Sequence, residues 1–157
     1  TLYRLHHVLL ETMGWPDCHL FEYRARGHRY GWSHARRSGG GLDGRRSARL
    51  ARLYHVATRP GDRLIYLYDF KDRWEHEVVV EAVLARQAGV RYPRCVGGAG
   101  ACPPEDCGGP DNYRLMLRIL RAPEHQDHDE VVAALGRGYD PHAFDVSEAN
   151  RRLRLLR

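Results

Sequence analysis

Three of the four cysteines fall in one short loop, and thiols are well suited to binding a soft metal ion. Cys95, Cys102 and Cys107 lie between Pro93 and Pro110, in a stretch that holds five glycines and four prolines and has no hydrophobic periodicity. Ordering such a loop costs on the order of 1–2 kcal/mol per residue in backbone entropy. We therefore expect a specific interaction to hold it in place.

One interpretation is a Zn²⁺ site in which these three thiolates are joined by a fourth ligand. His76 is the ligand we select, with Cys18 and His19 as alternatives. The cysteine spacing differs from the close pairs of familiar zinc modules. The sequence therefore also allows a purely structural interpretation, in which the cysteines are small buried side chains in a loop stiffened by its prolines.

Acidic residues also lie near a histidine in a predicted β-hairpin. The runs 64–68 and 74–84 read as two strands, and the four residues between them begin with Asp69 and end with Asp72. Carboxylates near His76 could perform acid–base catalysis or bind a hydrolytic metal ion. We favour a structural role, because aspartates in turns commonly accept hydrogen bonds from their own backbone.

Two further carboxylates, Glu105 and Asp106, follow the rigid dipeptide Pro103-Pro104. Prolines fix the backbone, so these acids are presented in a defined direction. They are interpreted either as an acidic ligand pair or as a pair that satisfies the backbone amides of the neighbouring glycine turns.

Charge is distributed unevenly along the chain, whose formal net charge is +5. Ten arginines stand against one acid between Arg24 and Arg59, whereas ten acids stand against four arginines between Glu105 and Glu148. Arginines interleaved with aromatic side chains suit phosphate contact and base stacking. A solvated surface explains the same pattern. A general preference of the chain for arginine also explains it, because Lys71 is the only lysine. The predicted nucleic-acid contacts are Arg24, Arg26, Arg29, Arg36, Arg37, Arg45 and Arg46.

Hydrophobic spacing assigns these residues to a small set of elements. Apolar residues at helical intervals predict a first helix from Leu2 to Met13, and alternation predicts strand structure between 19 and 30. A glycine-rich basic loop covers 33–47. Further helices are expected at 48–57, 113–120, 129–135 and from 147, the last capped by Asp145. The whole predicts an α+β fold, an antiparallel sheet with a long central hairpin packed by several helices.

Composition favours one globular domain covering residues 1–157. Apolar residues make up 43% of the chain, enough for a core of ordinary size. No apolar run approaches the roughly 20 residues that span a bilayer, and no export signal is apparent. We therefore expect a cytoplasmic protein with no membrane partner and with reduced cysteines.

Four groups of residues, in order along nearly the whole chain, carry a family resemblance. They are Leu5-His6 with Met13-Gly14-Trp15 and His19-Leu20; Tyr68-Asp69-Phe70 with Asp72, Trp74 and His76; Pro103-Pro104-Glu105-Asp106 with Gly108-Gly109; and Asp140-Pro141 with Ala143-Phe144-Asp145 and Asn150-Arg151. In these groups the chain resembles the plasmid pRiA4b ORF-3-like family, whose members are also described as resolvase-like passengers of insertion elements.

The resemblance implies a compact α+β domain but brings no established activity. A resolvase of the serine type needs a nucleophilic serine among positioned arginines, and no such arrangement is readable around the four serines of this chain. Family members begin with an additional strand, so the sheet is expected either to lack one edge or to be completed by another protein segment. Lys71 replaces a glycine expected in the hairpin turn.

Three functions remain open from the sequence. The first is an accessory binding domain of mobile DNA that contacts nucleic acid through the arginine region. The second is a metal-dependent enzyme, with Zn²⁺ between the Tyr68–His76 hairpin and the Cys95–Cys107 loop. The third is a protein-interaction domain that docks through the open sheet edge.

Overall fold

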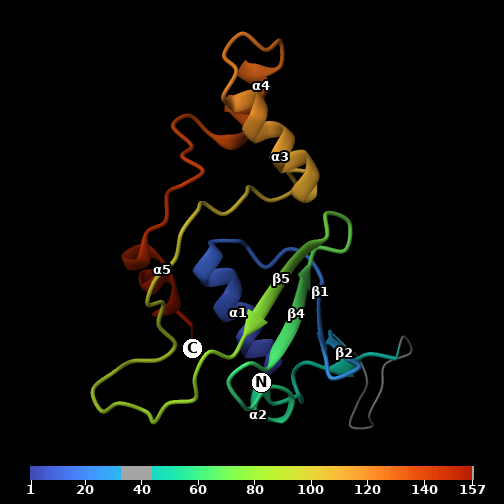
Figure 1. Ribbon diagram of the computed structural model, residues 1–157, viewed down its shortest axis with the longest axis vertical. Coiled ribbons are helices and arrows are strands. Elements are labelled where there is room, and N and C mark those ends of the chain that lie inside the picture. The colour runs from blue at the N-terminus through green and yellow to red at the C-terminus, as the bar shows by residue number, and fades with distance from the viewer. Residues whose placement is uncertain (33–43, 157) are drawn as a thin grey trace.

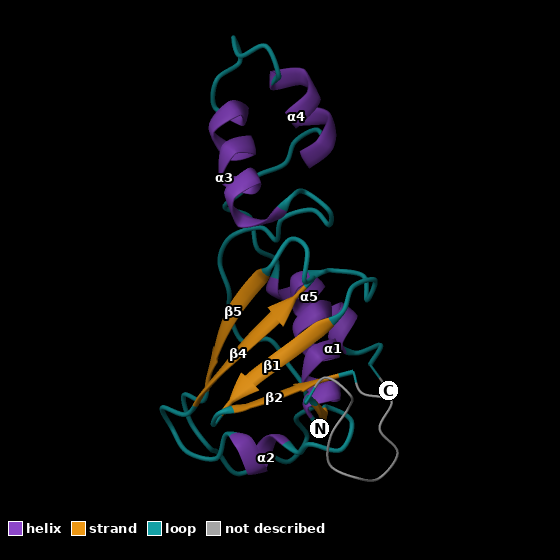
Figure 2. Cartoon of the chain, turned by 90° about the vertical axis from the view of Figure 1, so that its right-hand side faces the viewer, coloured by secondary structure: helices purple, strands orange, loops and turns teal. Residues whose placement is uncertain are grey.

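The computed structural model describes residues 1–32 and 44–156 and confirms the α+β class. A five-stranded sheet is covered by helices on one face (Figures 1 and 2). The elements in chain order are α1 (Leu2–Met13), β1 (Phe21–Ala25), β2 (His28–Gly31), β3 (Arg46–Ser47), α2 (Leu53–Val56), β4 (Arg63–Tyr68), β5 (Trp74–Val79), α3 (Gly109–Leu120), α4 (His128–Leu135) and α5 (Val146–Leu153).

The sheet has the strand order β3-β2-β1-β4-β5 and is mixed, because β3 runs parallel to β2 while the other neighbours are antiparallel. The predicted hairpin is present as β4 and β5, but its second strand ends at Val79 instead of 84. There the Val80 amide donates to the Asp62 carbonyl, and the chain beyond leaves the sheet. The predicted helix at 48–57 is likewise reduced to the single turn of α2.

The core lies between the sheet and α1. Strand alternation points Tyr23, Tyr66 and Tyr68 toward the helix, where all three are fully buried. His6 of α1 stacks on Phe21 with ring centroids 3.8 Å apart. Burial raises the pKa of the Tyr23 and Tyr66 hydroxyls, so these groups remain neutral members of the core.

Helix α5 packs against α1 and closes its carboxyl end. As predicted, Asp145 caps α5 by accepting from the amides of Ser147 and Glu148. Arg152 donates to the Glu11 carbonyl at 2.7 Å, which satisfies a group that the helix itself leaves unpaired. The contact fixes the carboxyl end of α1 and therefore the start of the connection to β1.

Helices α3 and α4 form a pair that projects from the end of the sheet where the β4–β5 turn lies (Figures 1 and 2). The pair has a small core of its own, made of Met116, Ile119, Val131 and Leu135. Its helices are amphipathic and short. Within residues 1–32 and 44–156, no helix has the length and apolar character needed to cross a membrane.

Candidate metal centre

Three connections meet at the end of the sheet nearest to α3. The α1–β1 connection brings Cys18 and His19, and the β4–β5 turn brings Asp69. The loop that leads into α3 brings Glu105 and Asp106. All five side chains belong to two overlapping groups, each with its ligand atoms within 4.8 Å of one another.

Asp72 fixes the position of the loop that carries the two acids. Its buried carboxylate accepts hydrogen bonds from the amides of Gly108 and Gly109, at 2.9 and 3.0 Å. These amides open α3, where the helix dipole favours a negative charge. Gly109 has φ 78°, and a Cβ there would lie 2.3 Å from the Asp72 carbonyl oxygen. Only glycine therefore fits this contact.

Trp15 and Tyr68 hold the other side of the same loop. The Trp15 indole N–H donates to the Pro103 carbonyl at 2.8 Å, and its ring stacks on Tyr68. The Tyr68 hydroxyl lies 2.7 Å from the Pro16 carbonyl and 3.0 Å from Oε1 of Glu105. Burial raises the pKa of this hydroxyl, so Tyr68 stays neutral and joins the α1–β1 connection to the acidic loop.

The imidazole of His19 lies between carboxylates on both of its nitrogens. Nε2 is 3.4 Å from Oε2 of Glu105 and 3.5 Å from Oδ1 of Asp106, while Nδ1 is 3.7 Å from Oδ2 of Asp69. Within the described part of the chain, His19 Nε2, Asp69 Oδ2 and Glu105 Oε2 are buried atoms without a hydrogen-bond partner. Such atoms are rare in folded proteins and ask for an explanation.

These distances match the spacing of ligands around a metal ion. A tetrahedron with bonds of about 2.0–2.2 Å separates its nitrogen and oxygen ligands by roughly 3.3–3.6 Å. Metal-bound histidines commonly donate their other ring N–H to a carboxylate, which fixes the tautomer. Asp69 occupies that second position, so Nε2 is left free to face Glu105 and Asp106.

The electrostatics of the cluster favour a cation. Burial, with a contribution from the neighbouring Asp106, raises the pKa of the Glu105 carboxyl against the opposing effects of Tyr68 and His19. Burial and the nearby acids likewise raise the pKa of the Cys18 thiol. A divalent cation would relieve this crowding of negative charge, since opposite charge favours the ionised forms.

The cysteine-based ligand set expected from the sequence is not assembled. In the part of the chain that the structure describes, no metal-sized group contains Cys95, Cys102 or Cys107. Cys95 is instead held by Asn150, which bonds both its amide and its carbonyl. Burial raises the pKa of the Cys102 thiol to about 12 and also raises that of Cys107. Cys102 and Cys107 pack against the hydrophobic core, which fits the structural interpretation, and metal binding by the three cysteines stays a prediction.

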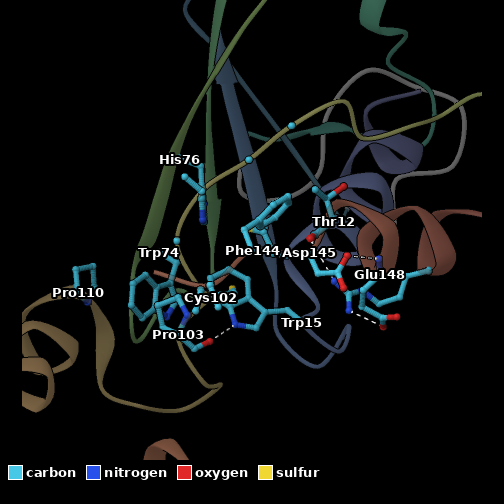
Figure 3. Close-up of a pocket in the computed structure, with 18 of the residues that line it drawn as sticks. Thr12, Trp15, Trp74, His76, Cys102, Pro103, Pro110, Phe144, Asp145 and Glu148 are labelled. Carbon is cyan, nitrogen blue, oxygen red and sulfur yellow. Dashed lines mark hydrogen bonds and ion pairs between the residues drawn. The ribbon is translucent and has the colours of Figure 1, made fainter. Parts of the chain in front are cut away.

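His76, the fourth member of that set, lines a different cavity of about 740 Å³ between β5, the 97–103 loop and α5 (Figure 3). Trp74 and Cys102 face the same cavity, and Phe144 packs against Gly98. Burial lowers the pKa of His76, as expected for a neutral ring against a tryptophan. The hairpin constellation is therefore divided, with Asp69 at the metal centre and His76 at this cavity.

The remaining family-motif residues have structural roles. Phe70 lies under the Arg45 guanidinium, 4.8 Å from ring centre to carbon, and Pro104 lies on the far side of the acidic loop with Gly108. Lys71 is not among the residues with positive φ, whereas Asp69 and Asp106 are, at 54° and 55°. Positive φ at Asp69 and Asp106 places two members of the candidate site in a conformation that L-residues seldom adopt, as is common at functional positions.

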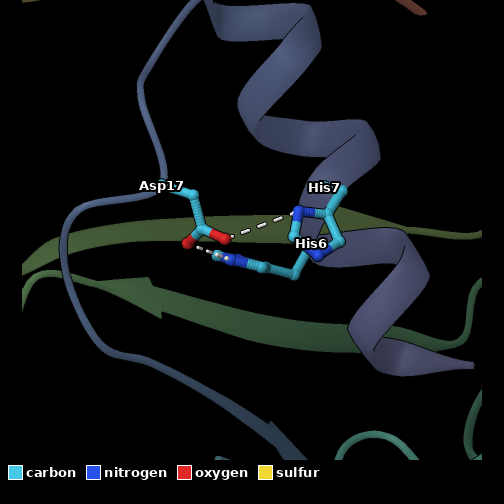
Figure 4. A group of neighbouring side chains, drawn as sticks. All are labelled: His6, His7 and Asp17. Atoms are coloured by element: carbon cyan, nitrogen blue, oxygen red, sulfur yellow. Dashed lines mark hydrogen bonds and ion pairs between the residues drawn. The ribbon is translucent and has the colours of Figure 1, made fainter. Parts of the chain in front are cut away.

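A second histidine cluster consists of His6, His7 and Asp17 (Figure 4). His6 and Asp17 line the same cavity as Cys18 and His19. Here His6 has a partner on each nitrogen, Tyr66 Oη at 2.7 Å and Asp17 Oδ1 at 2.9 Å. Burial outweighs Asp17 and lowers the pKa of His6. This histidine is a satisfied core residue that fixes the α1–β1 connection, so the two clusters differ in kind.

The arginines predicted to contact nucleic acid are largely paired within the protein. Glu22 is buried, and Arg24 and Arg45 donate to it at 2.9 and 2.7 Å, with Arg29 3.7 Å away. Although burial alone would raise the pKa of Glu22, these bonds hold it below its ordinary value. Arg26 pairs with Asp62, and Arg46 is exposed on β3. Arg36 and Arg37 lie outside the described residues, so the nucleic-acid contact stays a prediction.

Sequence reasoning named every member of the candidate centre but did not combine them. Cys18 and His19 were alternatives for a fourth zinc ligand. Asp69 was interpreted as a turn residue, and Glu105 and Asp106 were left as either an acidic ligand pair or a pair that satisfies the backbone amides of the glycine turns. The available signal was that three of the four groups carrying the family resemblance contain a potential ligand: His19, Asp69, and Glu105 with Asp106.

The family model described as plasmid pRiA4b ORF-3-like protein matches residues 1–148. The uncharacterized protein y4hQ of Sinorhizobium fredii (strain NBRC 101917 / NGR234) is 35% identical over 151 residues, which cover 96% of this chain and 76% of the relative. The crystal structure of a protein of unknown function, MM3350 from Methanosarcina mazei Go1, superposes with a TM-score of 0.81 at 31% identity, covering 94% of this chain and 82% of that one.

Gly109→Ala is predicted to destabilise the protein by about 2 kcal/mol or more, because the new Cβ meets backbone and the residue must keep positive φ. Gly97→Ala is the matched control, since a Cβ there meets nothing within 4 Å and its φ is not positive. The control should change the free energy of unfolding by less than about 1 kcal/mol. Urea unfolding of both variants measures the difference. Equal effects would show that the Asp72 contact does not hold the loop.

Proposed function

The chain belongs to the plasmid pRiA4b ORF-3-like family, and from that premise we propose that it is a metal-binding accessory domain. Its metal is a divalent cation, Zn²⁺ for the donor types present. The proposed ligands are His19, Glu105, Asp106 and Cys18, with Asp69 orienting the imidazole.

The proposal rests on one observation above all. Three polar atoms, from His19, Asp69 and Glu105, are buried at the meeting point of three separate connections without hydrogen-bond partners among the described residues. Leaving a buried polar group unpaired costs about 1–3 kcal/mol, and more when it is charged. A cation bound by His19 Nε2 and Glu105 Oε2 would satisfy two of these atoms, and it would fix the tautomer in which His19 Nδ1–H is directed at the third, Asp69 Oδ2.

The donor types favour Zn²⁺ among common divalent ions. Thiolate and imidazole suit Zn²⁺, whereas Mg²⁺ and Ca²⁺ prefer all-oxygen sites. Cys18 is exposed, and together with His19 it borders a cavity of about 270 Å³ that extends toward Trp32. One side of the metal would therefore be reachable from solvent.

A metal-dependent enzyme is the second candidate, and this cavity is the feature that favours it. The cavity is lined by α1 and by the chain from Asp17 to Phe21, so it differs from the sequence-based hypothesis of a site between the hairpin and the cysteine-bearing loop. A catalytic metal keeps a position for water or substrate, whereas a structural metal is fully coordinated by the protein. Binding of azide or cyanide to the Co²⁺-substituted protein, followed by its visible spectrum, separates the two.

We predict that the protein binds about one equivalent of Zn²⁺ near neutral pH and that His19→Ala abolishes this binding. His125→Ala is the control, because His125 also lies 3.7 Å from an aspartate but is exposed and far along the chain. Zinc content after purification without metal-affinity resin, and titration calorimetry of the chelated protein, measure the stoichiometry. Zinc bound equally by wild type and His19→Ala would contradict the site.

Glu105→Gln is predicted to raise the melting temperature of the metal-free protein at neutral pH while removing its stabilisation by Zn²⁺. The pKa of Glu105 is raised in the folded state, so its favourable contribution is complete below its ordinary pKa and is lost as the pH rises through the raised value. Glutamine carries no charge and avoids this loss. The affinity for the metal has the opposite pH dependence and increases as the pH rises, because Glu105 must be ionised to bind it.

Thermal unfolding in chelator and in excess Zn²⁺, measured from about pH 4 to pH 8, tests both parts. Zn²⁺ at 100 times its Kd should add about 2.7 kcal/mol to the stability of the wild type and nothing to the variant. Glu124→Gln, at an exposed position, should resemble the wild type throughout. If Glu105→Gln lowered stability in chelator and kept the zinc effect, Glu105 would be a structural residue.

A further inference from the structure

Beyond Glu81, the segment that follows β5 is basic, exposed and free of acids as far as residue 100. Residues 82–100 contain three arginines and neither aspartate nor glutamate. They run as an irregular chain along the end of the molecule opposite to α3 and α4 (Figure 1). With Arg4 from the first turn of α1, this segment lines an open cavity of about 670 Å³. The cavity is far from the candidate metal centre, which lies at the α3 end of the sheet.

The arginines of this cavity differ from those of the predicted stretch. Arg24, Arg29 and Arg45 gather on Glu22, so their charge is compensated inside the protein. Arg86 and Arg94, by contrast, form no ion pair with any carboxylate of the described residues. Their charge is available to an external anion, and a low local density of acids strengthens that attraction.

The aromatic ring of Tyr92 lies beside the charge of Arg86. The Arg86 guanidinium lies over the ring of Tyr92, 5.7 Å from its centre, and Tyr92 is 40% exposed. Leu84 and Val96 line the same cavity and are more than 80% exposed. Exposed apolar side chains that are grouped in one hollow and rimmed by charged residues are typical of ligand-binding grooves. The cavity therefore offers cations, a π-face and apolar walls to one ligand.

Single-stranded nucleic acid has the chemistry that matches all three features. Its phosphates suit arginines, and its bases stack on tyrosine and on guanidinium planes. A hollow of 670 Å³ is in the range of small-ligand sites, which is adequate for a nucleotide unit. We infer that this cavity is a binding site for single-stranded nucleic acid, with Arg86 and Arg94 contacting phosphate and Tyr92 stacking on a base. The inference is independent of the proposed metal centre.

The test uses fluorescence anisotropy with a labelled single-stranded oligonucleotide and the complete chain. Wild type should bind with an affinity that falls as salt increases, and Arg86→Ala or Arg94→Ala should each flatten the slope of log K against log salt by about 0.7. Tyr92→Ala should weaken binding about tenfold, as expected for loss of one stacked base. Substitutions in this exposed segment should leave the melting temperature and the zinc stoichiometry unchanged.

Arg118→Ala is the matched control, because Arg118 is an exposed arginine on α3 at the other end of the molecule. It should alter neither the affinity nor the slope. If Arg118→Ala lowered the affinity as much as the cavity variants do, the binding would be nonspecific electrostatic attraction and the proposed site would be wrong. A loss with Arg26→Ala or Arg46→Ala, and none with the cavity variants, would overturn it in favour of the stretch predicted from the sequence.

Two further probes decide the class of ligand. Adenosine monophosphate should displace the strand only at far higher concentration than unlabelled oligonucleotide does, and displacement at similar concentrations would make this a free-nucleotide site instead. Vesicles of anionic phospholipid should not bind through Arg86 and Arg94. Vesicle binding that these variants abolish, without oligonucleotide binding, would replace the inference with a membrane surface.

Discussion

The carboxylate of Asp72 joins the two parts of this fold. It projects from the β4–β5 turn and accepts the amide hydrogens of Gly108 and Gly109, the residues with which α3 begins. Because the contact is charged, buried and aligned with the helix dipole, it is stronger than an ordinary hydrogen bond. It requires glycine at 109, since a Cβ would meet the backbone of Asp72. The projecting α3–α4 pair and the acidic loop are both positioned by this contact.

The candidate centre follows from that constraint. Once the loop is docked, Glu105 and Asp106 face the imidazole of His19, and the Tyr68 hydroxyl joins Glu105 to the Pro16 carbonyl. Burial, with a smaller contribution from Asp106, raises the pKa of Glu105, and ionising this carboxyl at neutral pH disfavours the metal-free fold. A local loss of folding stability is common at sites whose residues are retained for function.

The fold was predictable from the sequence to the extent that local patterns decide it. Helical spacing gave α1 correctly, and alternation gave the β4–β5 hairpin. The extent of β5 was overestimated, because the apolar residues beyond Val79 read as strand although they have no neighbouring strand to pair with.

The site was only partly predictable. Cysteine enrichment pointed to Cys95, Cys102 and Cys107, but Cys102 and Cys107 pack against the core, and Asn150 holds Cys95. The grouping of His19 with Glu105 depends on contacts between residues more than eighty positions apart, which periodicity does not encode.

X-ray absorption at the zinc edge of the Zn²⁺-loaded protein tests the central claim most directly, because it reports the atoms bound to the metal. The account predicts one sulfur at about 2.3 Å, with the remaining ligands nitrogen and oxygen at about 2.0–2.2 Å, and a spectrum that loses its imidazole signal in His19→Ala. A shell dominated by sulfur would place the metal among the loop cysteines, and a shell that keeps its imidazole in that variant would place it elsewhere. Either result would contradict a centre built on His19, Glu105 and Asp106.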